Sequence, residues 1–216
     1  MKRKFLFILL IIVCLPMLFS CGYTQQEKNN ISQIRYNVFY GEQNGVCIKA
    51  FSEEREYPFI NDGVACNREN FVIVKVLNEF NPTKITLSFN GQTYASQGEY
   101  NANTNSVDYS FKVKRLPDKE IVVETETNST KTQITCKSML KSDTITPLTA
   151  LEKVNKEQSD FVSCLYENGE FKAEIYIRLI VENGYNFYYV GYAQGSNKIT
   201  AFLIDGVSGE ILAGKS

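Results

Sequence analysis

Between residues 33 and 138 the sequence consists of short apolar segments separated by turn residues, and no stretch keeps the spacing of a helix. About seven segments carry β-branched and aromatic residues in the pattern typical of strands. The breaks between them include Asn61-Asp62-Gly63, Asn81-Pro82, Asn90-Gly91 and Pro117-Asp118, all of which favour turns. Asn90-Gly91 predicts a hairpin, because a type I′ turn needs positive φ at both central residues.

This pattern predicts an antiparallel β-sandwich over residues 33–140. Its strand number and size are those of an immunoglobulin-like domain. The chain has no tryptophan, so the Cys-Trp-Cys core of a true immunoglobulin domain is absent. The expected likeness is therefore one of architecture only.

The pattern changes after residue 141. Thr146-Pro147 predicts the N-cap and first residue of a helix, and apolar residues at helical spacing extend it over residues 147–167. From residue 171 on, every second residue is apolar, and turns at Asn183-Gly184 and over 194–197 and 205–209 divide the segment. We expect one helix followed by a three- or four-stranded antiparallel meander, with the helix on its apolar face. The predicted fold is thus mainly β with two modules, a sandwich and an α+β module over 147–216.

The start of the chain predicts an export signal over residues 1–20. Lys2, Arg3 and Lys4 precede an apolar stretch over residues 5–18, which is the order found in signal peptides. The stretch is shorter than the ~20 apolar residues of a membrane-spanning helix. Residues 21–32 are polar and predict a flexible tether.

Leu18-Phe19-Ser20-Cys21 resembles the lipobox of bacterial lipoproteins. The resemblance implies cleavage before Cys21 and acylation of that residue, so that acyl chains hold the protein on the extracytoplasmic face of the cell membrane. Gly22 is not the aspartate that retains many such proteins at an inner membrane, which implies the outer membrane if the organism has two. The alternatives are an ordinary signal peptide with a chance cysteine, or an uncleaved anchor.

The sequence LIDGVSGEIL, residues 203–212, is similar to the end of the PepSY-type module. This module occurs in extracytoplasmic bacterial proteins and in propeptides of secreted peptidases. The matching positions are Asp205, Gly209, Glu210, Ile211 and Leu212, and Ser208 stands where threonine is common. The resemblance implies a non-catalytic role, either in restraining or sensing a peptidase or in binding a wall component.

Composition excludes several functions. The chain has no histidine, which removes Ser-His-Asp and Cys-His catalysis and the usual zinc sites. Loss of the signal would leave 20 of the 23 basic residues against 24 acidic ones, a net charge of −4, which does not favour nucleic acid. Asp205 and Glu210 supply too few oxygens for a calcium loop. We therefore expect no catalytic residues, no cofactor, no metal site and no nucleic-acid partner.

Four cysteines remain after the signal and Cys21, namely Cys47, Cys66, Cys136 and Cys164. An even number in an exported chain allows two disulfides. Proximity in the sequence favours Cys47–Cys66 and Cys136–Cys164. Buried free thiols are the alternative, because free cysteine is among the most buried residue types.

Tyrosines are concentrated in the predicted meander. Tyr188 and Tyr192 share one face, opposite Tyr185 and Tyr189. With Tyr176, the first pair is the candidate binding face for a glycan or a peptide; the alternative is cross-strand packing. The charged run at residues 53–56 is predicted to be a solvated loop.

Taken together, these features predict a membrane-anchored extracytoplasmic lipoprotein that binds a cell-wall, glycan or protein partner without catalysis. The second hypothesis is a regulator or inhibitor of a secreted peptidase, acting through residues 147–216. A third, less favoured, is a hydrolase that uses paired carboxylates.

Overall fold

The computed structural model describes residues 25–58, 64–77, 82, 84–96, 99–101, 106–127, 130–195 and 198–215. The predicted signal peptide, the acylation site Cys21 and the first part of the predicted tether lie outside these residues. Within the described ranges, no helix is long and apolar enough to cross a bilayer.

Most of the described chain is strand, which confirms the prediction of a mainly β fold. The strands are β1 (Ile31–Gln43), β2 (Val46–Glu56), β3 (Arg68–Leu77), β4 (Lys84–Phe89), β5 (Gln92–Ser96), β6 (Glu99–Asn101), β7 (Ser106–Lys112), β8 (Glu120–Glu126), β9 (Lys131–Ser138), β10 (Tyr166–Glu167), β11 (Glu170–Phe171), β12 (Glu174–Glu182), β13 (Tyr185–Gln194), β14 (Lys198–Asp205) and β15 (Ile211–Lys215). The helices are α2 (Pro147–Glu157), α3 (Ser159–Ser163) and a short one over residues 25–29.

Four hairpins turn at Asn-Gly pairs. Both residues have positive φ at Asn44-Gly45, Asn90-Gly91, Asn168-Gly169 and Asn183-Gly184. This is the backbone that a type I′ turn requires. The hairpin predicted at Asn90-Gly91 joins β4 to β5, and Asn183-Gly184 joins β12 to β13.

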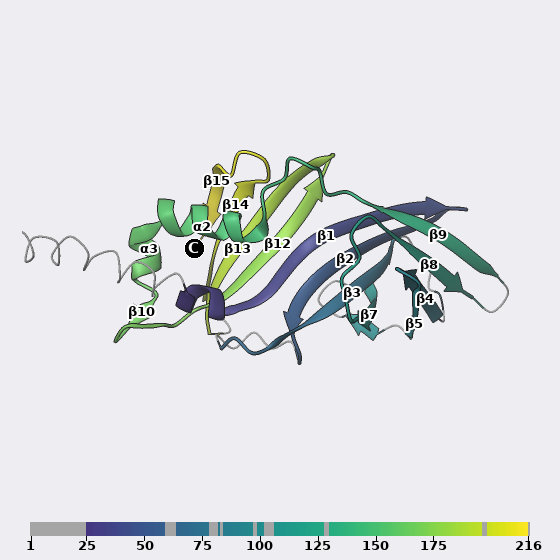
Figure 1. Ribbon diagram of the computed structural model, residues 1–216, viewed down its shortest axis with the longest axis horizontal. Helices are drawn as coiled ribbons and strands as arrows, with labels where there is room; N and C mark the ends of the chain where they lie inside the picture. The colour runs from purple at the N-terminus through teal and green to yellow at the C-terminus, as the bar shows by residue number, and fades with distance from the viewer. Residues whose placement is uncertain are drawn as a thin grey trace, which may run out of the picture.

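One long sheet joins both halves of the described chain, in the order β15-β14-β13-β12-β1-β2-β3-β7-β6, while β10 and β11 pair with each other in a separate small sheet. β1 is its central strand. It pairs antiparallel with β2 along its length and parallel with β12 near its start, and its far end also pairs with β9. Figure 1 shows α2 and α3 at one end of the molecule beside β12–β15, and β4, β8 and β9 at the other end, with β1 running between them.

The half of the sheet around β2, β3 and β7 packs against a second layer made of β9, β8, β4 and β5. Side chains from both layers form one apolar cluster, for example Phe39, Val74, Leu87 and Val123. Gly41 lets β1 approach β9, because a Cβ there would lie 2.7 Å from the carbonyl oxygen of Thr135.

The other half of the sheet, the meander β12–β15, packs against the helices. Thr146 caps α2, accepting a hydrogen bond from the backbone N–H of Thr149 at 3.1 Å. The buried side of α2, including Leu151 and Val154, packs on Ile177 and Leu179 in a second apolar cluster. The helix and the second strand layer cover the same face of the long sheet, which we call the inner face.

Two sequence expectations about the helices were wrong. The single helix expected over 147–167 ends at Glu157, because Gln158 leaves helical geometry, with φ −113° and ψ 35°. The change of direction places Phe161 of α3 edge-on to Tyr192, with ring centroids 5.4 Å apart. The expected tether is also shorter: residues 25–29 are helical, and Ile31 is 1% exposed in β1.

The expected division into two modules is not confirmed. β1 belongs to both halves, since Ile31 and Ile34 pair with β12 while Phe39 and Tyr40 pair with β9. No boundary can be drawn at residue 140 without cutting the pairing of β1 with β12. The two halves share one sheet and differ in what covers its inner face.

Candidate functional site

The tyrosine face predicted from the sequence is not exposed. Tyr188 and Tyr192 are each 1% exposed and Tyr176 is 3% exposed. The hydroxyl of Tyr188 donates to the Ile145 carbonyl oxygen at 2.8 Å, and that of Tyr192 donates to Asn155 Oδ1 at 2.5 Å. Tyr188 and Tyr192 share a face, as expected, but α2 and the segment before it cover that face, so both residues are part of the core. Tyr176 pairs with Gly191 and lies on the opposite face, so the grouping of Tyr176 with the other two was wrong.

The predicted disulfides do not form, and all four cysteines are free thiols. Cys47 pairs with Leu77, and Glu56 pairs with Arg68 at the other end of the same two strands. Cys47 and Cys66 are therefore about nine strand residues apart, on the order of 30 Å, far beyond disulfide reach. Cys136 is buried in the sandwich cluster, while Cys164 is exposed after α3.

The Asp205 turn is a structural turn. Asp205 Oδ1 accepts hydrogen bonds from the backbone of Val207 and Ser208 at 2.9 and 2.7 Å. These bonds lower the pKa of Asp205. Within the described residues, no group of three or more cysteine, aspartate or glutamate side chains is placed to hold a metal ion.

The face of the sheet opposite the helices, which we call the outer face, carries a row of arginines. Arg178 of β12 pairs with Arg35 of β1, and Arg35 pairs with Glu53 of β2. Two residues along each strand, and so on the same face, Tyr176 pairs with Gln33 and Gln33 pairs with Arg55. Strand geometry places these side chains on one face, because directly paired residues point to the same side of a sheet.

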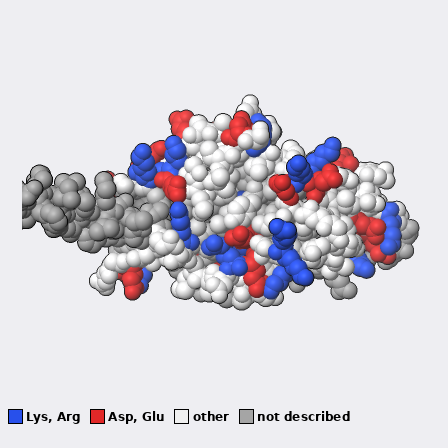
Figure 2. All heavy atoms as spheres, in the orientation of Figure 1, with Lys and Arg blue, Asp and Glu red and all other residues white. Residues whose placement is uncertain are grey.

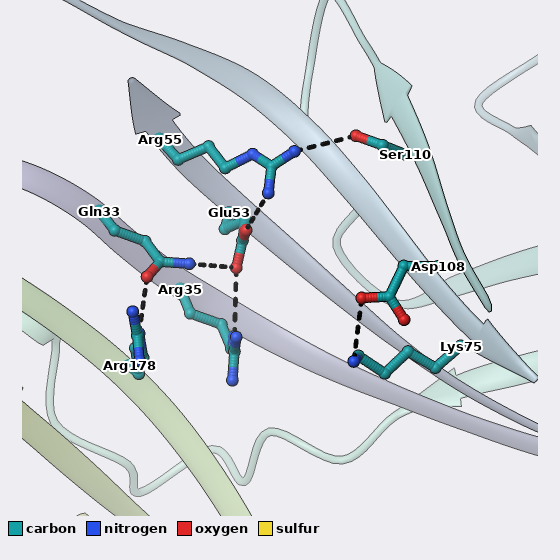
Figure 3. A network of polar contacts seen from close by, with 8 residues as sticks. All are labelled: Gln33, Arg35, Glu53, Arg55, Lys75, Asp108, Ser110 and Arg178. Atoms are coloured by element: carbon teal, nitrogen blue, oxygen red, sulfur yellow. Dashed lines mark hydrogen bonds and ion pairs between the residues drawn. The ribbon is translucent and has the colours of Figure 1, made fainter. Parts of the chain in front are cut away.

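Glu53 is the centre of this cluster. It is 2% exposed, and it accepts hydrogen bonds from Gln33 Nε2 at 2.8 Å and Arg35 Nε at 3.3 Å. Arg55 Nη1 lies 3.7 Å from its other oxygen. Figure 3 shows these side chains converging on Glu53, with Arg178 reaching Gln33 and Ser110 meeting Arg55. Arg35 and Arg55 therefore share one carboxylate, and Arg178 joins the cluster through Gln33. The three guanidiniums and the one carboxylate of this cluster leave an excess of two positive charges.

An aromatic ring lies close to each of the three guanidiniums. Arg35 lies 4.0 Å from the ring centroid of Phe51, and Arg55 lies 4.6 Å from that of Phe71. Arg178 lies between Tyr176 and Tyr189, at 5.3 and 5.7 Å. A guanidinium stacked on a ring keeps its N–H edge available for a planar anion.

The contact between Arg35 and Arg178 is unfavourable by itself. Like charges directly opposite each other destabilise a strand pair. Burial lowers the pKa of Arg35; the Glu53 carboxylate opposes this effect, and the charge of Arg178 adds to it. An anion placed between the two guanidiniums would remove this repulsion.

An apolar hollow adjoins the arginines on the outer face of the meander. Its volume is about 390 Å³, and Tyr189, Ile199, Ala201, Leu203 and Ala213 line it. Tyr189 pairs with Arg178 on one side and with Leu203 on the other. The hollow and the arginine cluster therefore meet at Tyr189.

A pair of buried carboxyls lies near the start of β12. Glu56 is 1% exposed and Glu174 is 0% exposed, and their side chains are hydrogen-bonded to each other. Burial and the contact with Glu174 raise the pKa of Glu56 to about 7, although the Cys66 N–H donates to it at 2.9 Å. This contact is shorter than the ~5–9.5 Å spacing of glycosidase carboxyls, so the pair does not have the geometry for glycoside hydrolysis.

The predicted solvated loop at residues 53–56 was wrong, since all four residues belong to β2. Residues 52–56 are all polar, so no alternation in the sequence indicated that the strand continues past Phe51. No feature of the sequence indicated that Arg35 and Arg178, far apart in the chain, become neighbours. That proximity depends on the parallel pairing of β1 with β12.

Figure 2 shows that basic and acidic side chains are interspersed on the face in view, with uncharged areas between them. The arginine cluster is thus a local feature of a chain whose formal net charge is −1.

Comparison with known proteins returned no match: no family model fits the chain, and no curated protein and no solved structure is significantly similar to it.

Proposed function

We propose that this chain is a lipid-anchored extracytoplasmic bacterial protein that binds an anionic ligand with an apolar part, without catalysis. The ligand's acidic group would lie on Arg35 and Arg178, and its apolar part in the hollow beside Tyr189. The observation that carries the proposal is a cluster of three guanidiniums with one carboxylate, in which Arg35 and Arg55 contact Glu53 and Arg178 donates to Gln33. The apolar hollow next to it supports an amphiphilic ligand rather than a small ion.

The anchoring part of the proposal rests on the sequence of residues 1–21. Mass spectrometry of the protein from the membrane fraction is expected to find acyl chains on Cys21 and no residues before it. The Cys21→Ser variant is expected to remain unacylated with its leader attached. An unacylated wild-type protein in the cell interior would contradict this part of the proposal.

The binding part follows from the chemistry of arginine. A guanidinium offers two parallel N–H donors that match a carboxylate or a phosphate. Arg35 and Arg178 sit partly withdrawn from water, where an ion pair is screened less than at a fully exposed site. Burial of an alkyl chain adds about 25 cal/mol per Å² of apolar surface removed from water.

Three probes distinguish the contribution of the ligand's charge to binding from that of its apolar chain. They are decanoate, decanol and acetate. Decanoate carries both the charge and the chain, decanol only the chain, and acetate only the charge. Calorimetric titration is expected to show tightest binding for decanoate, with an affinity that falls as salt is added.

The Arg178→Gln variant is expected to bind decanoate about tenfold more weakly, because one charge-assisted contact is lost. Arg115→Gln is the matched control, since Arg115 is exposed on the segment between β7 and β8 and is not part of the arginine cluster. Equal affinity of both variants for decanoate, with both folded by circular dichroism, would contradict binding at the arginine cluster.

A further inference from the structure

The inner face of the long sheet also carries a cleft, where the helical cover ends and the strand layer begins. Tyr36, Ser52 and Glu54 of β1 and β2 form its floor, and its volume is about 530 Å³. Residues 116–118 form one wall, and residues 144–147, up to the start of α2, form the other. We call this space the interlayer cleft. It is of the size that binds a small molecule.

Two hydroxyls at the lining of the cleft have no hydrogen-bond partner. These are Ser52 Oγ and Thr144 Oγ1, both buried from solvent, and the whole Ser52 residue is 0% exposed. Buried hydroxyls are nearly always hydrogen-bonded in folded proteins, because an unmade bond is costly. Their position at the cleft indicates a polar occupant that bonds to them.

The remaining lining defines the chemistry of that occupant. Glu54 is the one charged side chain of the floor, and Arg68 lies 3.4 Å from its carboxylate. Tyr36 also donates to Glu54; burial, with that carboxylate, raises the pKa of Tyr36 to about 12, so the hydroxyl stays protonated. Leu116, Pro117 and Ile145 supply apolar contacts. No lysine or arginine is among the described lining residues, so the cleft does not favour anions.

From this combination we infer that the interlayer cleft binds a neutral saccharide of one or two rings. Ring hydroxyls would bond to Ser52, Thr144 and the Glu54 carboxylate, while the less polar face of a ring packs on the proline and leucine side chains. This site is separate from the arginine cluster, which lies on the other face of the sheet and selects for charge.

The test is amide chemical-shift mapping of the whole protein with six neutral sugars: glucose, galactose, N-acetylglucosamine, maltose, lactose and chitobiose. At least one is expected to shift the amides of Ser52, Glu54, Thr144 and Ile145. No binding by any of the six, or binding that shifts other regions only, would overturn the inference.

Two substitutions in the cleft test the inference more directly than shift mapping alone. Ser52→Ala and Thr144→Val are each expected to weaken sugar binding about tenfold, while the unliganded protein stays as stable as wild type or becomes more stable, because an unpaired buried hydroxyl is removed. Ser88→Ala is the control, since Ser88 bonds to Thr93 on the exposed hairpin of β4 and β5. Unchanged affinity in both cleft variants would overturn the inference.

The arginine proposal is tested independently of the cleft. Arg178→Gln is expected to leave sugar affinity unchanged, and decanoate is expected not to compete with the sugar. Competition between the two ligands would show a single shared site and overturn the assignment of the sugar to the cleft.

Discussion

Glu53 illustrates how one residue sets the properties of the outer face. It is withdrawn from water and receives contacts from Gln33, Arg35 and Arg55. A buried carboxylate of this kind is tolerated only when its charge is matched and its oxygens are bonded. The carboxylate holds the guanidiniums in position, and their excess charge remains for a ligand.

Replacing the Glu53 carboxylate is expected to lower the free energy of unfolding. Glu53→Gln leaves Arg35 and Arg55 without their shared partner, and loss of one member of a buried pair costs about 3–5 kcal/mol. Urea unfolding is expected to show a drop of this size in the free energy of unfolding. The control is Glu124→Gln, whose contact with Lys131 is exposed and worth about 1 kcal/mol or less. A Glu53→Gln variant as stable as the control would contradict the role given to Glu53.

The carboxyl pair predicts a pH dependence. The pKa of Glu56 is about 7 in the folded protein against 4.5 when unperturbed. Between these values the folded state holds a proton that the unfolded state has released, so stability falls as the pH rises through this window and levels off above it. The loss is at most about 3 kcal/mol. Urea unfolding measures this loss of stability. The series is pH 4.5, 5.5, 6.5 and 7.5, which spans the two pKa values. Glu56→Gln is expected to flatten the profile, and a wild-type stability that rises over this range would contradict the assignment.

At the scale of elements, local sequence identified most strands and turns but not their long-range pairing. Alternation over residues 171–205 and the Asn-Gly pairs indicated the meander and its turns, and the observed β12, β13 and β14 agree. The break at Gln158 was missed because the apolar spacing continues across it. Tyr188 and Tyr192 were expected to share a face, and they do, but that face was proposed as a binding face and it is the one that α2 covers.

The close approach of β1 and β9 rests on one glycine. A Cβ on Gly41 would lie 2.7 Å from the Thr135 carbonyl oxygen and 2.9 Å from Cα of Cys136. Gly41→Ala is therefore expected to destabilise the protein by about 1–3 kcal/mol, measured by thermal or urea unfolding. Gly214→Ala in β15 is the control, because its nearest neighbour is the Phe202 side chain at 3.2 Å, which has more freedom to shift. Equal stability of the two variants would contradict the packing of β1 on β9.

At the scale of the whole molecule, the sequence suggested two modules, whereas the structure joins them in one sheet through β1. The parallel pairing of Ile31 and Ile34 with Ile175 and Ile177 connects residues more than a hundred positions apart. Composition and periodicity carry no information about such a pairing, because the sequence of β1 is equally compatible with the first strand of an isolated sandwich.

A shared central strand predicts cooperative unfolding. Amide signals from Leu87 in the sandwich cluster and Leu179 in the helix-covered cluster are expected to disappear at the same urea concentration, since neither half keeps its sheet when β1 detaches. Two separate transitions would show that the halves are independent modules after all.

The most direct test of the proposed binding is the location of decanoate on the folded protein. Amide chemical-shift mapping is expected to show the largest changes at Arg35, Arg178, Tyr189 and Leu203, on the outer face of β1, β12, β13 and β14. Acetate should affect only the arginine end of this set. The absence of shifts at Arg35 and Arg178 at saturating decanoate, or shifts confined to the inner face, would contradict the account.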